Sequence, residues 1–315
     1  MFSYDFNKRK KIPDYIVRFF ALCGMRMEDI YLVRGPVRFS QVIVPRLSFD
    51  LSMYTDKFLL PFRRAAAAVP AGKAEKVYLT RTQFKTWNTQ VTWGEEEVEK
   101  EFKKNGFKVV AMEALSLDEQ ISVMKGARVI AGVSGTALHG AVYGEHIEDV
   151  IILNRAECGA EAQFVINEAI GAKTYVCRAY VDILPSPSSY AHTGGPYFIG
   201  MTRWMHAFFR DYGLKAYTGE MKPEKYLRSY LQAYRESVHV QAGRSACQSA
   251  PVPVESLDHF FALEARSSCI LPLRLLWLRI LSHVAWGNWG TRLRSRYRYY
   301  RSLRRYPILR ERGED

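Results

Sequence analysis

The sequence predicts an α/β fold built on a parallel sheet, and three observations indicate this class. Between residues 76 and 180, short apolar runs alternate with segments of helical character. The helical segments begin or end on typical signals, such as the acidic run Glu95–Glu97 or the glycine at position 106. The composition, 48% hydrophobic and 24% charged, is that of a folded protein. Such an alternation requires right-handed crossovers and places ligands at the carboxyl ends of the strands.

The predicted strands are the short apolar runs of this region: Val77–Leu79, Phe107–Met112, Val129–Ala131, Val150–Leu153 and Thr174–Cys177. The clearest helix start is the capping box formed by Ser116 and Glu119. The clearest stop is Gly171, which follows an amphipathic segment. On signals of this kind, helices are predicted over residues 95–105, 116–126, 136–143, 160–170, 202–212 and 223–238.

The segment before residue 76 has a weaker pattern. Two apolar runs, Ile30–Val33 and Val42–Val44, are predicted as strands, and Arg63–Val69 is predicted as a short helix that ends before Pro70. A segment of this length is too small for an ordinary core of its own. We therefore interpret residues 1–75 as a reduced lobe or the end of a larger domain, followed by a domain over 76–240.

The C-terminal region is strongly basic. The net charge of the chain is +13, and residues 266–315 hold twelve Arg, no Lys and three acidic residues. An apolar stripe from Leu273 to Val284 has helical spacing, but its twelve residues span only about 18 Å, less than a bilayer core. Seven Arg and three Tyr follow within 292–305. This pattern predicts a linker over 241–255 and a basic amphipathic tail over 256–315 that binds an anionic membrane surface through 270–312.

Several classes of site are not indicated. The cysteines are odd in number and scattered, without zinc spacing, which is typical of reduced thiols. We expect no signal peptide, no membrane-spanning helix and a cytoplasmic location on the inner face of the membrane. The chain has no D-x-D motif, so no metal and no other cofactor is predicted. Nucleic-acid binding by the Arg/Tyr tail is an alternative, but the amphipathic stripe favours lipid.

The stretch Arg128–Gly144 is the strongest local signal for a ligand. An apolar run reaches Gly132, and Gly135 then opens a segment that tolerates a helix. Backbone N–H groups at such a turn can bind an anion. The spacing G-x-x-G-x-x-x-x-G differs from the dinucleotide fingerprint and from a P-loop. An ordinary strand–turn–helix connection is the alternative interpretation.

The region from Lys76 to Arg155 resembles the bacterial branch of glycosyltransferase family 61, a group often linked to capsular polysaccharide biosynthesis. The resemblance rests on motifs in the same order and at close spacing: VYLTR (77–81), GEEEVEKEFKKNGFKVV (94–110), EALSLDEQI (113–121), ARVIAG (127–132) and SGTALHG (134–140). It implies a GT-B architecture, with residues 76–240 as a Rossmann-like donor lobe and 1–75 as a reduced acceptor-side lobe. It also implies an inverting transferase that uses a nucleotide-sugar donor.

The sequence departs from the family pattern in three places. Ser134 stands where many members have His, and Gly140 stands where an Asn commonly closes the motif. The acceptor-side region before VYLTR is normally longer than the 75 residues found here. A short acceptor-side lobe is expected to affect turnover more than it affects donor binding.

Six residues are the candidate donor-binding set: Arg81, Glu113, Ser134, Gly135, Thr136 and His139. Amide groups around Ser134–Thr136, helped by hydroxyls and by Arg81, can stabilise a departing diphosphate in place of a metal. Glu113 can accept a hydrogen bond from a ribose hydroxyl. Each residue also has a structural alternative: a surface ion pair for Arg81, a helix cap for Ser134 and Thr136, a solvated carboxylate for Glu113, and packing for His139.

Two functions follow from these observations. The first is an inverting glycosyltransferase that acts on a surface glycan or lipid-linked acceptor at the membrane. The second is a non-catalytic relative that serves as an assembly or binding factor in polysaccharide biosynthesis. No catalytic base is assigned; His192, in a Pro/Ser/Gly-rich loop, is a possible base, although a surface histidine is the simpler interpretation.

Overall fold

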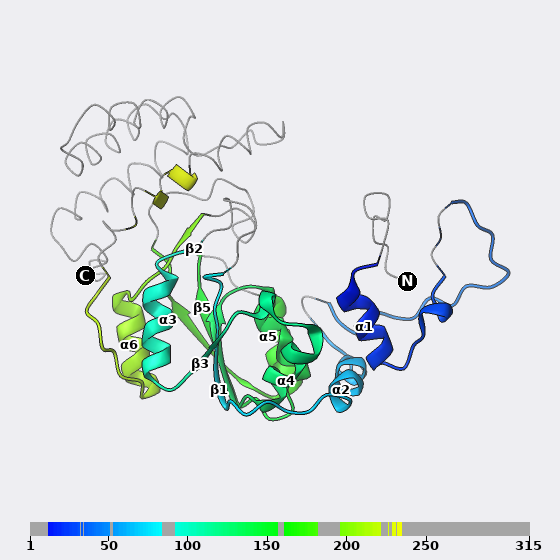
Figure 1. Cartoon of the computed structure of the whole chain (residues 1–315), viewed down its shortest axis with the longest axis horizontal. Coiled ribbons are helices and arrows are strands. Elements are labelled where there is room, and N and C mark those ends of the chain that lie inside the picture. The colour runs from blue at the N-terminus through cyan, green and yellow to red at the C-terminus, as the bar shows by residue number, and fades with distance from the viewer. Residues whose placement is uncertain are drawn as a thin grey trace. The chain divides into compact units, whose positions relative to one another are not determined.

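The structure is a computed structural model, and Figure 1 shows its arrangement of helices and strands. The residues that it describes are 12–31, 33, 35–50, 53–83, 92–156, 161–181, 196–221, 226, 229, 230 and 232–234. The chain divides into two compact units. The first unit contains Met1–Leu79, Val110–Ile152 and Ala160–Tyr175. The second unit contains Thr80–Val109, Leu153–Gly159 and Val176–Asp315.

A five-stranded sheet, with the strand order β3-β1-β4-β5-β6, is the main β structure. Its strands are β1 (Lys76–Leu79), β3 (Lys108–Val110), β4 (Val129–Val133), β5 (Asp149–Asn154) and β6 (Lys173–Arg178). β1 pairs in parallel with β4, with Val77 opposite Ile130 and Leu79 opposite Gly132. The side chains of β4 and β5 are buried almost throughout, as expected for central strands of a parallel sheet. The predicted α/β class with a parallel sheet is confirmed.

The helices of the first unit pack around a short 3-10 helix. They are α1 (Asp14–Leu22), α2 (Leu60–Ala67), α4 (Leu117–Gly126) and α5 (Glu161–Ile170), and the 3-10 helix η4 spans Thr136–Tyr143. α2, α4 and α5 all contact η4, while α1 packs on α2 and α4. The capping box predicted for α4 is formed: the Ser116 and Glu119 side chains each accept the other's backbone N–H.

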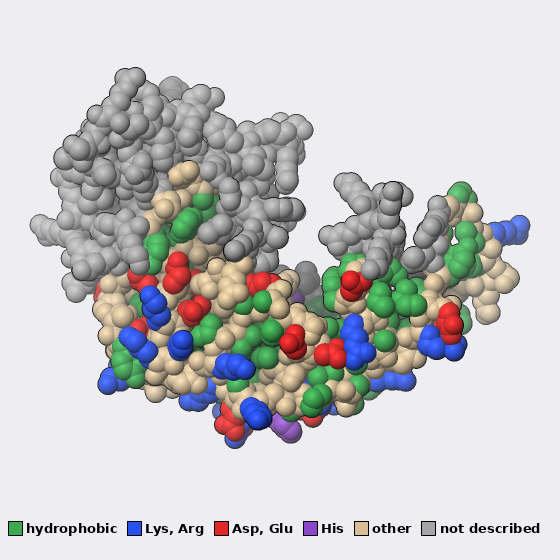
Figure 2. All heavy atoms as spheres, viewed as in Figure 1, with side chains coloured by type: hydrophobic (Ala, Val, Ile, Leu, Met, Phe, Trp, Pro, Cys, Tyr) green, Lys and Arg blue, Asp and Glu red, His purple; other side chains and the backbone are tan. Residues whose placement is uncertain are grey.

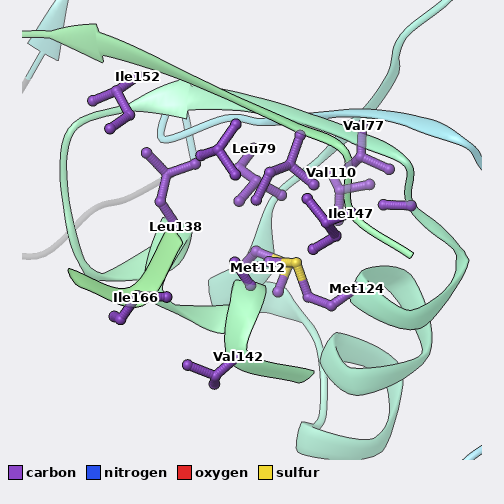
Figure 3. Packing of buried hydrophobic residues seen from close by; sticks show 14 of the residues in the cluster. Val77, Leu79, Val110, Met112, Met124, Leu138, Val142, Ile147, Ile152 and Ile166 are labelled. Carbon is purple, nitrogen blue, oxygen red and sulfur yellow. The ribbon is translucent and has the colours of Figure 1, made fainter. Parts of the chain in front are cut away.

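One hydrophobic cluster fills the first unit (Figure 3). It combines side chains from β1, β5, η4, α4 and α5, among them Leu79, Met124, Leu138, Ile152 and Ile166. Each of these five side chains is 4% exposed or less. The alternation of apolar strands and amphipathic helices in the sequence therefore produces one buried core cluster in this unit.

In the second unit, two helices pack against each other through aromatic side chains. α3 (Glu95–Lys104) and α6 (Arg203–Tyr212) meet where Phe102 and Phe209 lie edge to face, with ring centroids 5.1 Å apart. A two-stranded parallel sheet pairs β2 (Thr92–Trp93) with β7 (Tyr197–Phe198). Gly94 begins α3 at φ 85°, where a Cβ atom would overlap the carbonyl oxygen of Ile199. Glycine is therefore required at this turn by both conformation and space.

Several sequence-based predictions differ from the structure. Residues 42–44, and the described residues of 30–33, form no strand, although the apolar pattern favours one. The helix predicted over 63–69 forms three residues earlier as α2, with Pro61 in its first turn. The predicted helix over 136–143 has the right bounds but is a 3-10 helix. Helix α1, the 3-10 helices η1 (Met27–Asp29) and η3 (Met112–Ala114), and the β2–β7 pair were not predicted.

Other predictions fall on residues that the structure does not describe. These are the linker over 241–255, the tail over 256–315, His192 and most of the helix predicted over 223–238. Among the described residues, no helix combines the length and the apolar character needed to cross a bilayer. Figure 2 shows acidic and basic side chains interspersed over the visible face of the described residues.

Candidate functional site

The glycine turn after β4 is shaped by close packing at Gly132. This residue pairs with Leu79 of β1, and a Cβ atom here would lie 3.1 Å from the Leu79 carbonyl oxygen. The same atom would lie 3.5 Å from a methyl group of Leu138. At Gly135 the backbone is extended, with φ 163° and ψ 174°, which other residues also adopt. The close packing at Gly132 therefore explains why a glycine stands there. The backbone conformation at Gly135 does not by itself require a glycine.

The start of η4 presents backbone amides without a side-chain cap. Gly135 is the N-cap residue, and within the described part of the chain it has no side-chain cap. The first bond of the helix runs from Leu138 N–H to the Gly135 carbonyl oxygen at 3.2 Å, so the N–H groups of Thr136 and Ala137 precede it. Ser134 is 4% exposed and Thr136 is exposed. The capping role remains the structural alternative for Ser134 and Thr136.

His139 lies in the middle of η4 and is partly buried. Burial lowers the pKa of its imidazole from the ordinary value, since removal from water disfavours the charged form. The side chain is therefore neutral at pH 7 in the free protein. In that state it can donate or accept a hydrogen bond but cannot contribute a positive charge to a bound anion.

Arg81 belongs to the second unit and follows β1 by two residues. Its backbone N–H donates to a carboxylate oxygen of Glu95 at 2.8 Å. The neighbouring Thr80 hydroxyl donates to Glu99 at 2.7 Å. Both acceptors lie in the first two turns of α3, so the residues that follow β1 are tied to that helix. This fixes the backbone from which the Arg81 side chain extends.

Glu113 lies on the wall of an open cavity of about 750 Å³ in the first unit. One wall is α1, which contributes Asp14, Tyr15 and Arg18, and the other is formed by residues from Glu113 to Gln120. Glu113 is exposed, and its carboxylate makes no hydrogen bond or ion pair within the described part of the chain. It comes three residues after β3 ends, near the carboxyl edge of the sheet, as predicted.

An ion pair connects the two walls of this cavity. Nε and Nη2 of Arg18 donate to the two carboxylate oxygens of Asp118 at 2.8 and 2.6 Å. This bidentate contact holds the pKa of the Asp118 carboxyl below its usual range and raises the pKa of Arg18. Both groups therefore stay charged at neutral pH.

Sequence reasoning missed the contribution of α1 to the cavity. The available signal was Pro13 followed by an acid at Asp14 and apolar residues at Ile16, Phe19 and Phe20. Of the predicted set, the structure places Ser134, Gly135, Thr136 and His139 on one short stretch and Glu113 on the cavity, all in the first unit.

No metal site is found among the described residues, where no group of three or more His, Cys, Asp or Glu side chains is placed to hold an ion. Carboxylates are present at the cavity, but Asp118 is engaged by Arg18. The groups that can meet an anion in the predicted set are the amides at the start of η4 and the Arg81 guanidinium.

Comparison with known proteins shows that the N-terminal part of the chain is similar to one family. The model of the family Glycosyltransferase 61 matches residues 11–155. The match supports glycosyltransferase family 61. It begins at residue 11, before α1, whereas the motifs seen in the sequence begin at Lys76, and it includes all six candidate donor-binding residues. No curated protein and no solved structure matched the chain.

The family match suggests a class of chemistry. Glycosyltransferase 61 proteins suggest glycosyl transfer, and the α/β architecture fits an α/β glycosyltransferase. Such a reaction requires stabilisation of the leaving group.

Proposed function

We propose that this protein is an inverting glycosyltransferase that takes a sugar from a nucleotide-sugar donor. The observation that carries the proposal is the uncapped start of η4 within the region matched by the family model. There, the N–H groups of Thr136 and Ala137 precede the first helical hydrogen bond. A diphosphate oxygen accepts hydrogen bonds from such groups without the cost of displacing a protein cap.

The sheet supports a donor bound along its carboxyl edge. β1 and β4 are neighbouring parallel strands, so the residues that follow them begin at the same edge. β3 lies on the other side of β1, about 10 Å from β4 at the usual strand spacing. In this proposal the diphosphate binds at Ser134–Thr136 with help from Arg81, and Glu113 accepts a ribose hydroxyl.

The reaction proceeds by direct displacement. A base removes the proton of the acceptor hydroxyl, whose oxygen forms a bond to the anomeric carbon from the face opposite the leaving group. The bond from that carbon to the diphosphate breaks, and its electron pair stays on the phosphate oxygen. The amides of η4 and Arg81 stabilise the charge that develops there. His139, neutral in the free protein, contributes a hydrogen bond and no charge.

The proposal also includes the acceptor of the sugar and the location of the enzyme. We propose a surface glycan or lipid-linked saccharide, such as a capsular polysaccharide intermediate, as the acceptor. The basic tail over 256–315 would hold the enzyme on the inner face of an anionic membrane, with 270–312 in contact with lipid. The family match supports the glycan class, and the charge of the tail supports the membrane.

Thermal melting in the presence of nucleotide diphosphates tests donor binding. A ligand at one hundred times its Kd adds about 2.7 kcal/mol to the unfolding free energy, which raises the Tm by several degrees. Arg81→Ala is expected to abolish most of this shift, whereas Arg210→Ala, on the exposed face of α6, leaves it unchanged. No shift with any nucleotide diphosphate or nucleotide sugar would contradict the proposal.

Turnover separates an enzyme from a non-catalytic relative. A binder that only assists assembly raises its Tm with the donor but neither transfers the sugar nor hydrolyses the donor. Release of nucleotide diphosphate, measured with and without glycan acceptors, distinguishes these outcomes. Any sustained release above that of the Arg81→Ala variant identifies an enzyme.

A further inference from the structure

The cavity between α1 and the start of α4 has the dimensions of a small-molecule site. Its volume of about 750 Å³ falls within the range typical of ligand pockets. Both walls belong to the first unit, and the Arg18–Asp118 ion pair fixes one wall to the other. The cavity is therefore a built feature of this unit.

The lining combines an aromatic ring with fixed polar groups. The Tyr15 side chain is 58% exposed and presents its ring to solvent, and Leu115 and Leu117 add apolar surface. Gln120 uses its Nε2 to donate to the carbonyl oxygens of Met112 and Leu115, at 3.0 and 3.1 Å. Its Oε1 is thereby oriented as an acceptor. Glu113 supplies a second acceptor, as shown above.

Hydrogen-bond donors lie on the same wall of the cavity as the Tyr15 ring. Arg18 uses Nε and one N–H of Nη2 on Asp118, and a guanidinium carries five N–H groups. Arg18 lines the cavity, so its guanidinium offers further N–H groups to a ligand there. A sugar ring has matching chemistry, since its hydroxyls both donate and accept and its C–H face packs on an aromatic ring.

The charge of the lining discriminates between sugars. Among the described residues of the lining, Glu113 and Asp118 are acidic and Arg18 is basic, so these three groups are negative overall. The Asp118 charge is already balanced by Arg18. A ring that carries a carboxylate meets further like charge, whereas a neutral or amino-substituted ring does not.

We propose that this cavity is a saccharide site that accepts neutral or amino sugars and rejects uronic acids. The proposal rests on the proposed function, because the ring is either the ribose of the donor or a sugar of the acceptor. Both sources offer the same vicinal hydroxyls, and they are distinguished experimentally below. The charge selection applies to either source.

Saturation-transfer NMR on the full chain, without nucleotide, tests the site. The probes are methyl β-ribofuranoside, neutral methyl hexosides, a methyl hexosaminide and a methyl hexuronide, each at the same millimolar concentration. We expect transfer to the neutral and amino sugars, and binding of the hexuronide weaker by about tenfold or more. A response to the riboside alone identifies the ribose end of the donor, and a response to hexosides identifies the acceptor.

Variants assign the signal to this cavity. Tyr15→Ala is expected to remove most of the transfer, whereas Tyr31→Ala, also exposed and in the same unit, retains it. Glu113→Lys reverses the preference towards the hexuronide, while Glu168→Lys, on the exposed surface of α5, does not. A gain of binding cannot come from unfolding, so this reversal keeps the test valid if Tyr15→Ala folds poorly.

Three results would overturn the proposal: no transfer to any sugar, equal transfer in the wild type and Tyr15→Ala, or equal binding of neutral and acidic sugars. Because no nucleotide is present, failure here leaves the diphosphate melting shift intact. Conversely, loss of that shift in Arg81→Ala says nothing about this cavity. The two proposals therefore fail separately.

Discussion

At the scale of single residues, two buried carboxylates bind backbone groups of the second unit. Glu95 and Glu101 are fully buried, and each accepts a backbone N–H from another part of the unit, from Arg81 at 2.8 Å and from Tyr217 at 2.6 Å. The three acids Glu95–Glu97 suit the positive end of a helix by sequence alone. The structure shows that one of them also fixes the chain that leaves β1.

Glu95→Ala tests that role. The change removes a charge-assisted acceptor and leaves the Arg81 N–H without it, so the free energy of unfolding is expected to fall by about 2–3 kcal/mol. Chemical denaturation measures the loss. Glu96→Ala, exposed in the same helical turn, is the matched control and changes stability by less than about 0.5 kcal/mol. Equal effects of the two substitutions would contradict a specific role for Glu95.

His139 makes stability depend on pH in a predictable direction. Burial lowers its pKa in the folded protein, so the unfolded chain takes up the proton first as the pH falls. The free energy of unfolding should therefore decrease as the pH drops below about 6.5, the ordinary His value. His139→Gln is expected to flatten this slope between pH 7.5 and 5.5, as followed by denaturation at each pH. The exposed His146→Gln should leave it unchanged.

At the scale of elements, local sequence signals determined helix ends more reliably than strands. The capping box at Ser116 and the glycine after α3, at φ 82°, are formed as predicted because a cap depends only on neighbouring residues. The run Val42–Val44 is apolar but forms no strand and remains more than half exposed. A strand requires a pairing partner, which an apolar pattern does not provide.

The close approach of Gly126 to Gly72 is another element-scale feature. Gly126 ends α4, and a Cβ atom there would overlap the carbonyl oxygen of Gly72, whose own N–H donates to Ser122 at 2.7 Å. Gly126→Ala is expected to lower the free energy of unfolding by about 2 kcal/mol, because backbone cannot give way as a flexible side chain does. Gly219→Ala, which meets nothing within 4 Å, is the control in thermal melting. A neutral Gly126→Ala would show that the loop at Gly72 moves freely.

For the whole molecule, charge is distributed unevenly along the chain. Most of the basic excess lies in residues 266–315, whereas the described residues show both signs interspersed (Figure 2). In the cavity of the first unit, Glu113 stands beside the Arg18–Asp118 ion pair, which disfavours an anionic ligand. The tail, which remains a prediction, is the part suited to an anionic membrane.

Replacing four tail arginines tests this assignment in the full chain. Arg292, Arg294, Arg296 and Arg298 changed together to Gln should weaken co-sedimentation with anionic vesicles at least about a hundredfold, since each basic residue contributes about 1 kcal/mol. Binding to neutral vesicles and gel shifts with RNA at the same salt are the controls. Preferential loss of RNA binding would instead favour the nucleic-acid alternative.

The sequence by itself determined the order and class of the elements around the sheet, because hydrophobic periodicity and caps are local. It also located the glycine motif and the resemblance that the family match supports. Only the tertiary structure revealed that α1 forms one wall of a cavity with Glu113 on the other, that Glu95 is buried, and that η4 is a 3-10 helix. These features depend on contacts between residues far apart in the chain, and no local pattern encodes which distant residues will meet.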